Sequence, residues 1–184
     1  MFVALTPPDE VSEHLAEFLE PRQEAGGPLR WSPPQRWHLT LAFLPSVADT
    51  KLDELSERLT ETAAGRPPLD VRLEGAGAFP NPAAAKTLWA GVAGDLEPLG
   101  QLAAAVRAAT VRAGLSVDGG KFRPHLTLAR INRPLDVTRW LRVLDLYQGP
   151  SWQVGELSLI ESQLGGGSRG RTRYLPREAF PVGK

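Results

Sequence analysis

The sequence predicts a fold of strands and helices built from two similar halves. Short apolar runs bounded by Gly and Pro are typical of buried strands, and leucines spaced three or four residues apart are typical of amphipathic helices. Each half holds segments of both kinds and one copy of the tetrapeptide His-Leu-Thr-Leu, at 38–41 and at 125–128. We therefore expect one unit spanning residues 1–184 that arose by an internal duplication.

The strand patterns are short and evenly spread along the chain. Segment 75–86 is rich in Gly, Pro and Ala, so we expect it to be a loop. The segments with a strand pattern are 2–5, 37–44, 69–74, 87–92, 122–130 and 152–164, with a last strand near 174–175.

The helices are predicted from apolar stripes that would cover one face of each helix. In the first helix the stripe is formed by Val11, Leu15, Phe18 and Leu19, and the pattern ends before the glycines at 26 and 27. Three more helices are expected, at about 52–65, 99–114 and 137–146.

The composition excludes several classes of function. Lys and Arg together number 21, as do Asp and Glu, so no whole-molecule positive field draws the chain onto long nucleic acid and a phosphate must meet a local patch. The absence of Cys excludes thiol nucleophiles, disulfides and Cys-ligated metals. We see neither a signal peptide nor a membrane span, and we expect a cytoplasmic location.

The two His-Leu-Thr-Leu copies are the strongest functional signal. They contain two of the three histidines in the chain. Because side chains alternate along a strand, His38 and Thr40 should face one way and their leucines the other, and the same holds for His125 and Thr127. Two such strands side by side would present two imidazoles and two hydroxyls around one small volume.

That arrangement suits the hydrolysis of a phosphodiester. One group must take a proton from the attacking water, and another must give a proton to the leaving oxygen. Histidine can fill either role near neutral pH, so a pair of imidazoles needs no metal. A 2′,3′-cyclic phosphate is a plausible substrate, because its strained ring opens readily. The pH profile of activity should be bell-shaped.

The residues around the two motifs resemble the two-histidine phosphoesterase superfamily, and within it the RNA 2′,3′-cyclic phosphodiesterases, or 2′-5′ RNA ligase family. The likeness extends over nearly the whole chain. It is carried by the segments 2–5, 37–44, 77–80, 88–92 and 122–130.

The resemblance implies an α+β fold with two lobes, in which two antiparallel β-sheets are flanked by helices in a pseudo-two-fold arrangement and the active-site cleft lies between the sheets. It implies opening of the cyclic phosphate to a 2′-phosphate without metal or other cofactor, and a reverse reaction that joins RNA ends by a 2′-5′ bond. RNA ends or small cyclic nucleotides would be the partners, no membrane is involved, and we expect a monomer.

By the same resemblance, His38 would protonate the leaving 3′ oxygen and His125 would act as the base on water, although the order could be inverted. Thr40 and Thr127 would hold the non-bridging oxygens, and Arg130 would supply charge to the phosphate. Base preference is not readable, because Phe2 and Phe43 are the only aromatic side chains that suggest a stacking partner.

Alternative functions stay open at this point. The chain could be a noncatalytic module that binds RNA ends or nucleotides, or a two-histidine phosphodiesterase for another cyclic or 2′-5′-linked nucleotide. A histidine metal enzyme is disfavoured, because no carboxylate stands at ligand spacing in either motif.

The remaining polar residues have weaker patterns. His14 has no partner motif and is interpreted as structural or exposed. The Gly-rich segment with Arg169, Arg171 and Arg173 is equally compatible with a solvated loop and with RNA contact.

Overall fold

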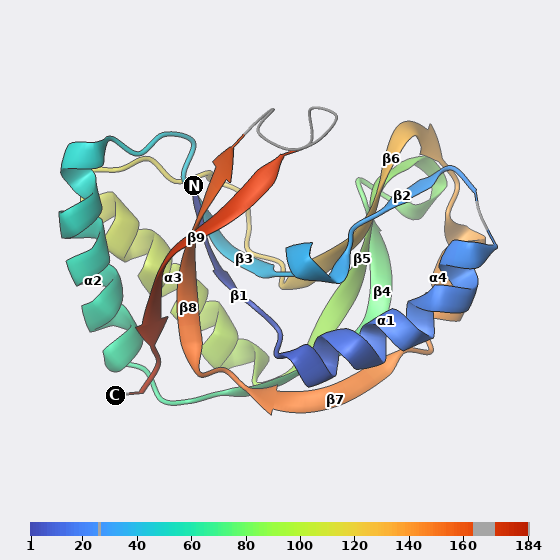
Figure 1. The fold of residues 1–184 in the computed structure, drawn as a ribbon, viewed down its shortest axis with the longest axis horizontal. Coiled ribbons are helices and arrows are strands. Elements are labelled where there is room, and N and C mark those ends of the chain that lie inside the picture. The colour runs from blue at the N-terminus through green and yellow to red at the C-terminus, as the bar shows by residue number, and fades with distance from the viewer. Residues whose placement is uncertain (26, 164–171, 184) are drawn as a thin grey trace.

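One antiparallel sheet runs through the described part of the chain (Figure 1). The computed structural model describes residues 1–25, 27–163 and 172–183. The strands follow the order β7-β4-β5-β6-β3-β1-β8-β9, and β2 also pairs with β6. Their bounds are β1 (Phe2–Leu5), β2 (Leu29–Trp31), β3 (Leu39–Phe43), β4 (Asp70–Phe79), β5 (Ala85–Gly94), β6 (His125–Leu135), β7 (Gln148–Gln153), β8 (Glu156–Gln163) and β9 (Arg173–Pro181).

The sheet divides into two lobes, each of which carries two helices, so the α+β fold with two lobes is confirmed. The first lobe contains β3, β1, β8 and β9, and the second contains β6, β5, β4 and β7 with β2. Helices α2 (Leu52–Ala64) and α3 (Leu96–Arg112) pack on the first lobe, and α1 (Asp9–Glu24) and α4 (Thr138–Leu144) on the second (Figure 1). No helix among the described residues is long and apolar enough to cross a bilayer.

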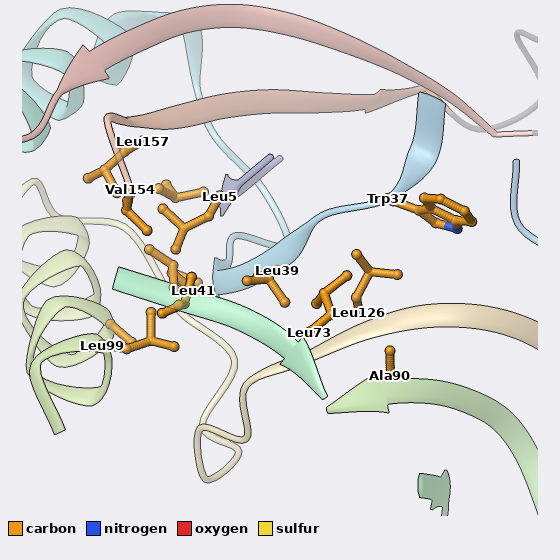
Figure 2. Close-up of a cluster of buried hydrophobic side chains, with 14 of the residues drawn as sticks. Leu5, Trp37, Leu39, Leu41, Leu73, Ala90, Leu99, Leu126, Val154 and Leu157 are labelled. Atoms are coloured by element: carbon orange, nitrogen blue, oxygen red, sulfur yellow. The ribbon is translucent and has the colours of Figure 1, made fainter. Parts of the chain in front are cut away.

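The two lobes meet where β3 runs beside β6. Leu39 pairs with Leu126, the single registered pair between these strands in the described chain. Both leucines are buried and belong to the main hydrophobic core, which continues through Leu41 and Leu73 (Figure 2). The two halves of the sheet are therefore joined by one short contact that sits on a continuous apolar core, so the two sheets that the resemblance implied are parts of one sheet.

Two expectations about the strands were wrong in detail, and one strand was missed. Segment 75–86 is mostly strand, because β4 continues to Phe79 and β5 begins at Ala85. The strand expected at 152–164 is interrupted after Gln153, so that it contributes to both β7 and β8. The short strand β2 was not predicted at all, because three residues are too few to show alternation.

We predict that the core at the junction of the lobes dominates stability. Leu126 is fully buried, so Leu126→Ala should lower the free energy of unfolding by about 2–5 kcal/mol. Leu146 is 81% exposed, and Leu146→Ala should change it by less than about 0.5 kcal/mol. Urea unfolding of both variants measures the difference. An equal decrease in the free energy of unfolding in the two variants would contradict the prediction.

Candidate active site

The junction of the lobes brings the two motifs together. Continuing the register of Leu39 and Leu126 by one residue in each direction sets His38 opposite Thr127 and Thr40 opposite His125. Directly opposed side chains of an antiparallel pair lie about 4.5–5.5 Å apart at Cβ. The two leucines are buried while these four residues are half-buried, as the alternation predicted. We call the surface that carries these four side chains the histidine face.

The two histidines are held in the same way. Nδ1 of His38 lies 2.7 Å from the carbonyl oxygen of Arg36, and Nδ1 of His125 lies 2.7 Å from that of Arg123. A carbonyl oxygen only accepts, so Nδ1 is the donor in both rings. Nε2 is therefore the nitrogen that each ring has free to exchange a proton.

Aromatic side chains fix the orientation of both rings. His38 is stacked on Phe2 with ring centroids 4.6 Å apart and meets the edge of Tyr174 at 5.4 Å. His125 packs edge-on to Phe79 at 5.0 Å and lies 6.0 Å from Trp89. Sequence reasoning considered Phe2 as a stacking partner for a base, but it supports a histidine ring instead.

A glycine makes room for one of these aromatic residues. Trp89 on β5 is paired with Gly77 on one side and with Thr127 on the other. A Cβ at Gly77 would stand only 2.1 Å from the indole ring, so only glycine lets Trp89 lie flat across β4. Trp89 is thus part of the histidine face, beside Thr127.

A β-bulge in each motif strand changes which residues reach the histidine face. On β6, Leu88 pairs with Ala129 and Trp89 with Thr127, so Leu128 is an extra residue. Alternation therefore resumes one residue later. Arg130 lies exposed on the same face as His125, although it stands an odd number of positions, five, further along the strand. The structure thus places Arg130 with the other predicted site residues.

The first motif has an equivalent bulge but a different side chain. Val3 pairs with Ala42 and Ala4 with Thr40, which leaves Leu41 as the extra residue. Phe43 then takes the position that corresponds to Arg130, and it is 45% exposed. The histidine face therefore has an aromatic side chain at one end and a cation at the other.

Burial and neighbouring charges act on the ring of His38. Burial lowers its pKa from the usual value, and the positive charges of His125 and Arg130 act in the same direction. The hydrogen bond to the carbonyl of Arg36 opposes them. The influence of His125 and Arg130 on this ring shows that all three groups act within one electrostatic site.

A pocket of about 190 Å³ opens beside His125. It is bordered by β3 and α3 of the first lobe, by the segment that precedes β6, and by His125 at the start of β6 in the second lobe. Its polar and aromatic lining includes Thr40, Phe43, Lys121, Phe122 and Arg123. This pocket gives a small molecule access to the His125 side of the face.

The other polar residues considered from sequence lie elsewhere. His14 is exposed on α1, and its Nδ1 lies 3.1 Å from the hydroxyl of Tyr147. Arg169 and Arg171 lie outside the described residues, while Arg173 is the exposed first residue of β9. The described residues contain no group of three or more His, Asp or Glu side chains placed to hold a metal ion.

Comparison with known proteins places the chain in a family. The family model of the 2′-5′ RNA ligase superfamily matches residues 7–166. The chain belongs to this superfamily. Within it, the chain is 34% identical over 133 residues to an RNA 2′,3′-cyclic phosphodiesterase of Archaeoglobus fulgidus, covering 72% of this chain and 73% of that protein.

Other superfamily members resemble the chain over nearly its full length. An RNA 2′,3′-cyclic phosphodiesterase of Methanothermobacter thermautotrophicus is 26% identical over 166 residues, which is 89% of each protein. The crystal structure of E. coli LigT complexed with 3′-AMP superposes with a TM-score of 0.78 and 28% identity, covering 100% of this chain and 97% of LigT.

We predict that His38 makes stability depend on pH. Its pKa is lower in the folded protein than in the unfolded chain, where it is near 6.5, so the unfolded state takes up a proton first as the pH falls. This contribution to stability is present above about pH 6.5 and is lost as the pH falls through the folded pKa. Between about pH 7.5 and 5.5 the free energy of unfolding should fall less in His38→Gln than in the wild type.

Urea unfolding at several pH values measures this difference. His14→Gln is the matched control, because it removes a histidine from outside the site and keeps the contribution of His38. The same pH dependence in His38→Gln and the wild type would show that this ring titrates alike in both states.

Proposed function

We propose that this superfamily member hydrolyses 2′,3′-cyclic phosphates at RNA or nucleotide ends to 2′-phosphates, with His38 and His125 as an acid-base pair that needs no metal. The observation that carries the proposal is the convergence of both Nδ1-anchored imidazoles and both threonines at the junction of the lobes. The names of the curated relatives support the same reaction. Reversible 2′-5′ joining of RNA ends is the same chemistry in reverse.

The arrangement of the four side chains fits an in-line displacement at phosphorus. His38 and His125 occupy diagonal corners of the face, with a threonine at each of the other two corners. A phosphate held between them has one Nε2 on the side of the attacking water and the other on the side of the leaving oxygen. The hydroxyls of Thr40 and Thr127 donate to the non-bridging oxygens as negative charge develops.

Arg130 adds a full positive charge to this environment. The bulge at Leu128 brings its side chain to the histidine face, at the end nearer to His38 and Thr127. A guanidinium can donate two parallel hydrogen bonds to a phosphate. We assign it to the reacting phosphate, where its charge offsets that of the bound substrate.

We assign His125 as the base and His38 as the acid. The pocket beside His125 gives the attacking water room on that side. The lowered pKa of His38 favours its neutral ring in the unbound protein, which is the form that a base requires, and so argues for the inverse order. A bound phosphate anion raises the pKa of the same ring and supplies the protonated form that an acid requires.

We further propose that the chain acts as a monomer in the cytoplasm. All residues of the proposed site come from one chain, with β3 and β6 contributed by its two lobes. A site that is complete within one two-lobed domain needs no second copy.

We predict turnover without metal. The purified protein should open a 2′,3′-cyclic mononucleotide in excess EDTA, and the product should be the 2′-phosphate, because the 3′ oxygen leaves. Chromatography against 2′- and 3′-phosphate standards identifies the product. Loss of turnover with EDTA that returns with added metal would overturn the proposed mechanism, and binding without turnover would favour the noncatalytic alternative.

We predict that the two histidines differ in their response to the leaving group. His38→Ala and His125→Ala should each lower kcat on the cyclic substrate by about 10²- to 10⁴-fold. p-Nitrophenolate leaves without being protonated, so bis(p-nitrophenyl) phosphate should be hydrolysed far better by His38→Ala than by His125→Ala. The reverse result would exchange the two roles. Circular dichroism of both variants checks that the fold is retained.

A further inference from the structure

Two arginines stand opposite each other at the end of the histidine face. Arg30 on β2 pairs directly with Arg130 on β6, and both side chains are exposed. Like charges in directly opposed positions destabilise a sheet. Among the described residues neither guanidinium forms an ion pair with a carboxylate, and the polar contact of Arg30 is a 3.2 Å hydrogen bond to Oδ1 of Asn132. The pair is a site of uncompensated positive charge.

The position of Arg30 is fixed by the backbone around it. Leu29 pairs with Ile131 and Trp31 with Ala129, and the amide of Ser32 donates to the carbonyl of Leu128 at 2.8 Å. The next residue of the strand, Trp31, packs its ring against that of Trp140, with ring centroids 5.6 Å apart. These contacts hold the short strand in register, so the two arginines are kept together by the fold.

The direction of the reaction determines which part of a substrate meets this pair. The inference rests on the function proposed above, in which His38 protonates the leaving 3′ oxygen. The ribose that carries this oxygen then lies on the His38 side of the phosphate, which is the side of Arg130. The rest of an RNA chain continues from the 5′ oxygen of the same ribose through an internucleotide phosphate.

We propose that Arg30 binds this internucleotide phosphate while Arg130 binds the reacting phosphate. Two neighbouring anions neutralise two neighbouring cations, which removes the repulsion that the free protein carries in this cross-strand pair. A cyclic mononucleotide has no internucleotide phosphate and gains nothing from Arg30. Arg30 is thus the residue that favours RNA ends over free cyclic nucleotides.

The test compares three substrates that share one reacting group. They are cyclic 2′,3′-UMP, a uridine dinucleotide that ends in a 2′,3′-cyclic phosphate, and the same dinucleotide with an uncharged methylphosphonate linkage. Arg30→Gln should lower kcat/KM on the charged dinucleotide by about tenfold, the effect of one charge-assisted hydrogen bond, and leave the other two substrates unchanged. Added salt should lower kcat/KM on the charged dinucleotide less in Arg30→Gln than in the wild type, because one charge-charge contact is missing.

Arg142→Gln is the matched control, because it removes one exposed arginine from α4 of the same lobe. It should leave all three substrates unaffected. If Arg30→Gln lowers kcat/KM equally on all three substrates, or on none of them, the inference is overturned. Failure of the wild type to hydrolyse any of the three substrates overturns the proposed function itself, so the two failures are distinguished.

Discussion

The pairing of Leu39 with Leu126 is the contact on which the site depends. It is a single registered pair, yet it sets both imidazoles and both hydroxyls on one face. A slip of one residue in β3 or β6 would turn that strand's histidine toward the core and a leucine toward water. Burial of both leucines in the continuous core makes such a slip costly. The apolar half of each motif thus holds the polar half in place, and this explains why the motif is a tetrapeptide of alternating character.

The pseudo-two-fold arrangement becomes asymmetric where the chemistry requires it. The two motif strands share their pattern of burial and the position of their bulges, after Thr40 and after Thr127. After the bulge, the next side chain on the histidine face is Phe43 in one lobe and Arg130 in the other. Hydrolysis has a water side and a leaving-group side, so a fully symmetric site would not distinguish them. Two strands with the same burial pattern and the same bulge position, but with a different side chain after the bulge, give the face a direction.

The sequence predicted the parts of the site that depend on local periodicity. The placement of His38, Thr40, His125 and Thr127 on one face of their strands follows from alternation within each motif. Their convergence was expected because each half of the chain carries one copy of the motif. The aromatic support of the rings, the bulges and the strand that carries Arg30 depend on pairings between distant segments, which no local pattern reveals. The wrong expectation of a loop at 75–86 has the same origin, because Gly77, which reads as a turn residue, makes room for Trp89.

The balance of charge on the whole chain constrains how it meets RNA. With 21 basic and 21 acidic residues there is no long-range field to hold the body of a polynucleotide, so nonspecific binding along RNA is weak. Local attraction is available on the histidine face, where Arg30 and Arg130 are adjacent and unpaired with carboxylates among the described residues. A pair of cations next to an acid-base site can neutralise two phosphates and no long run of them. If Arg30 and Arg130 act as proposed above, this pair selects the end of an RNA, because only there does a reactive phosphate have a single neighbour.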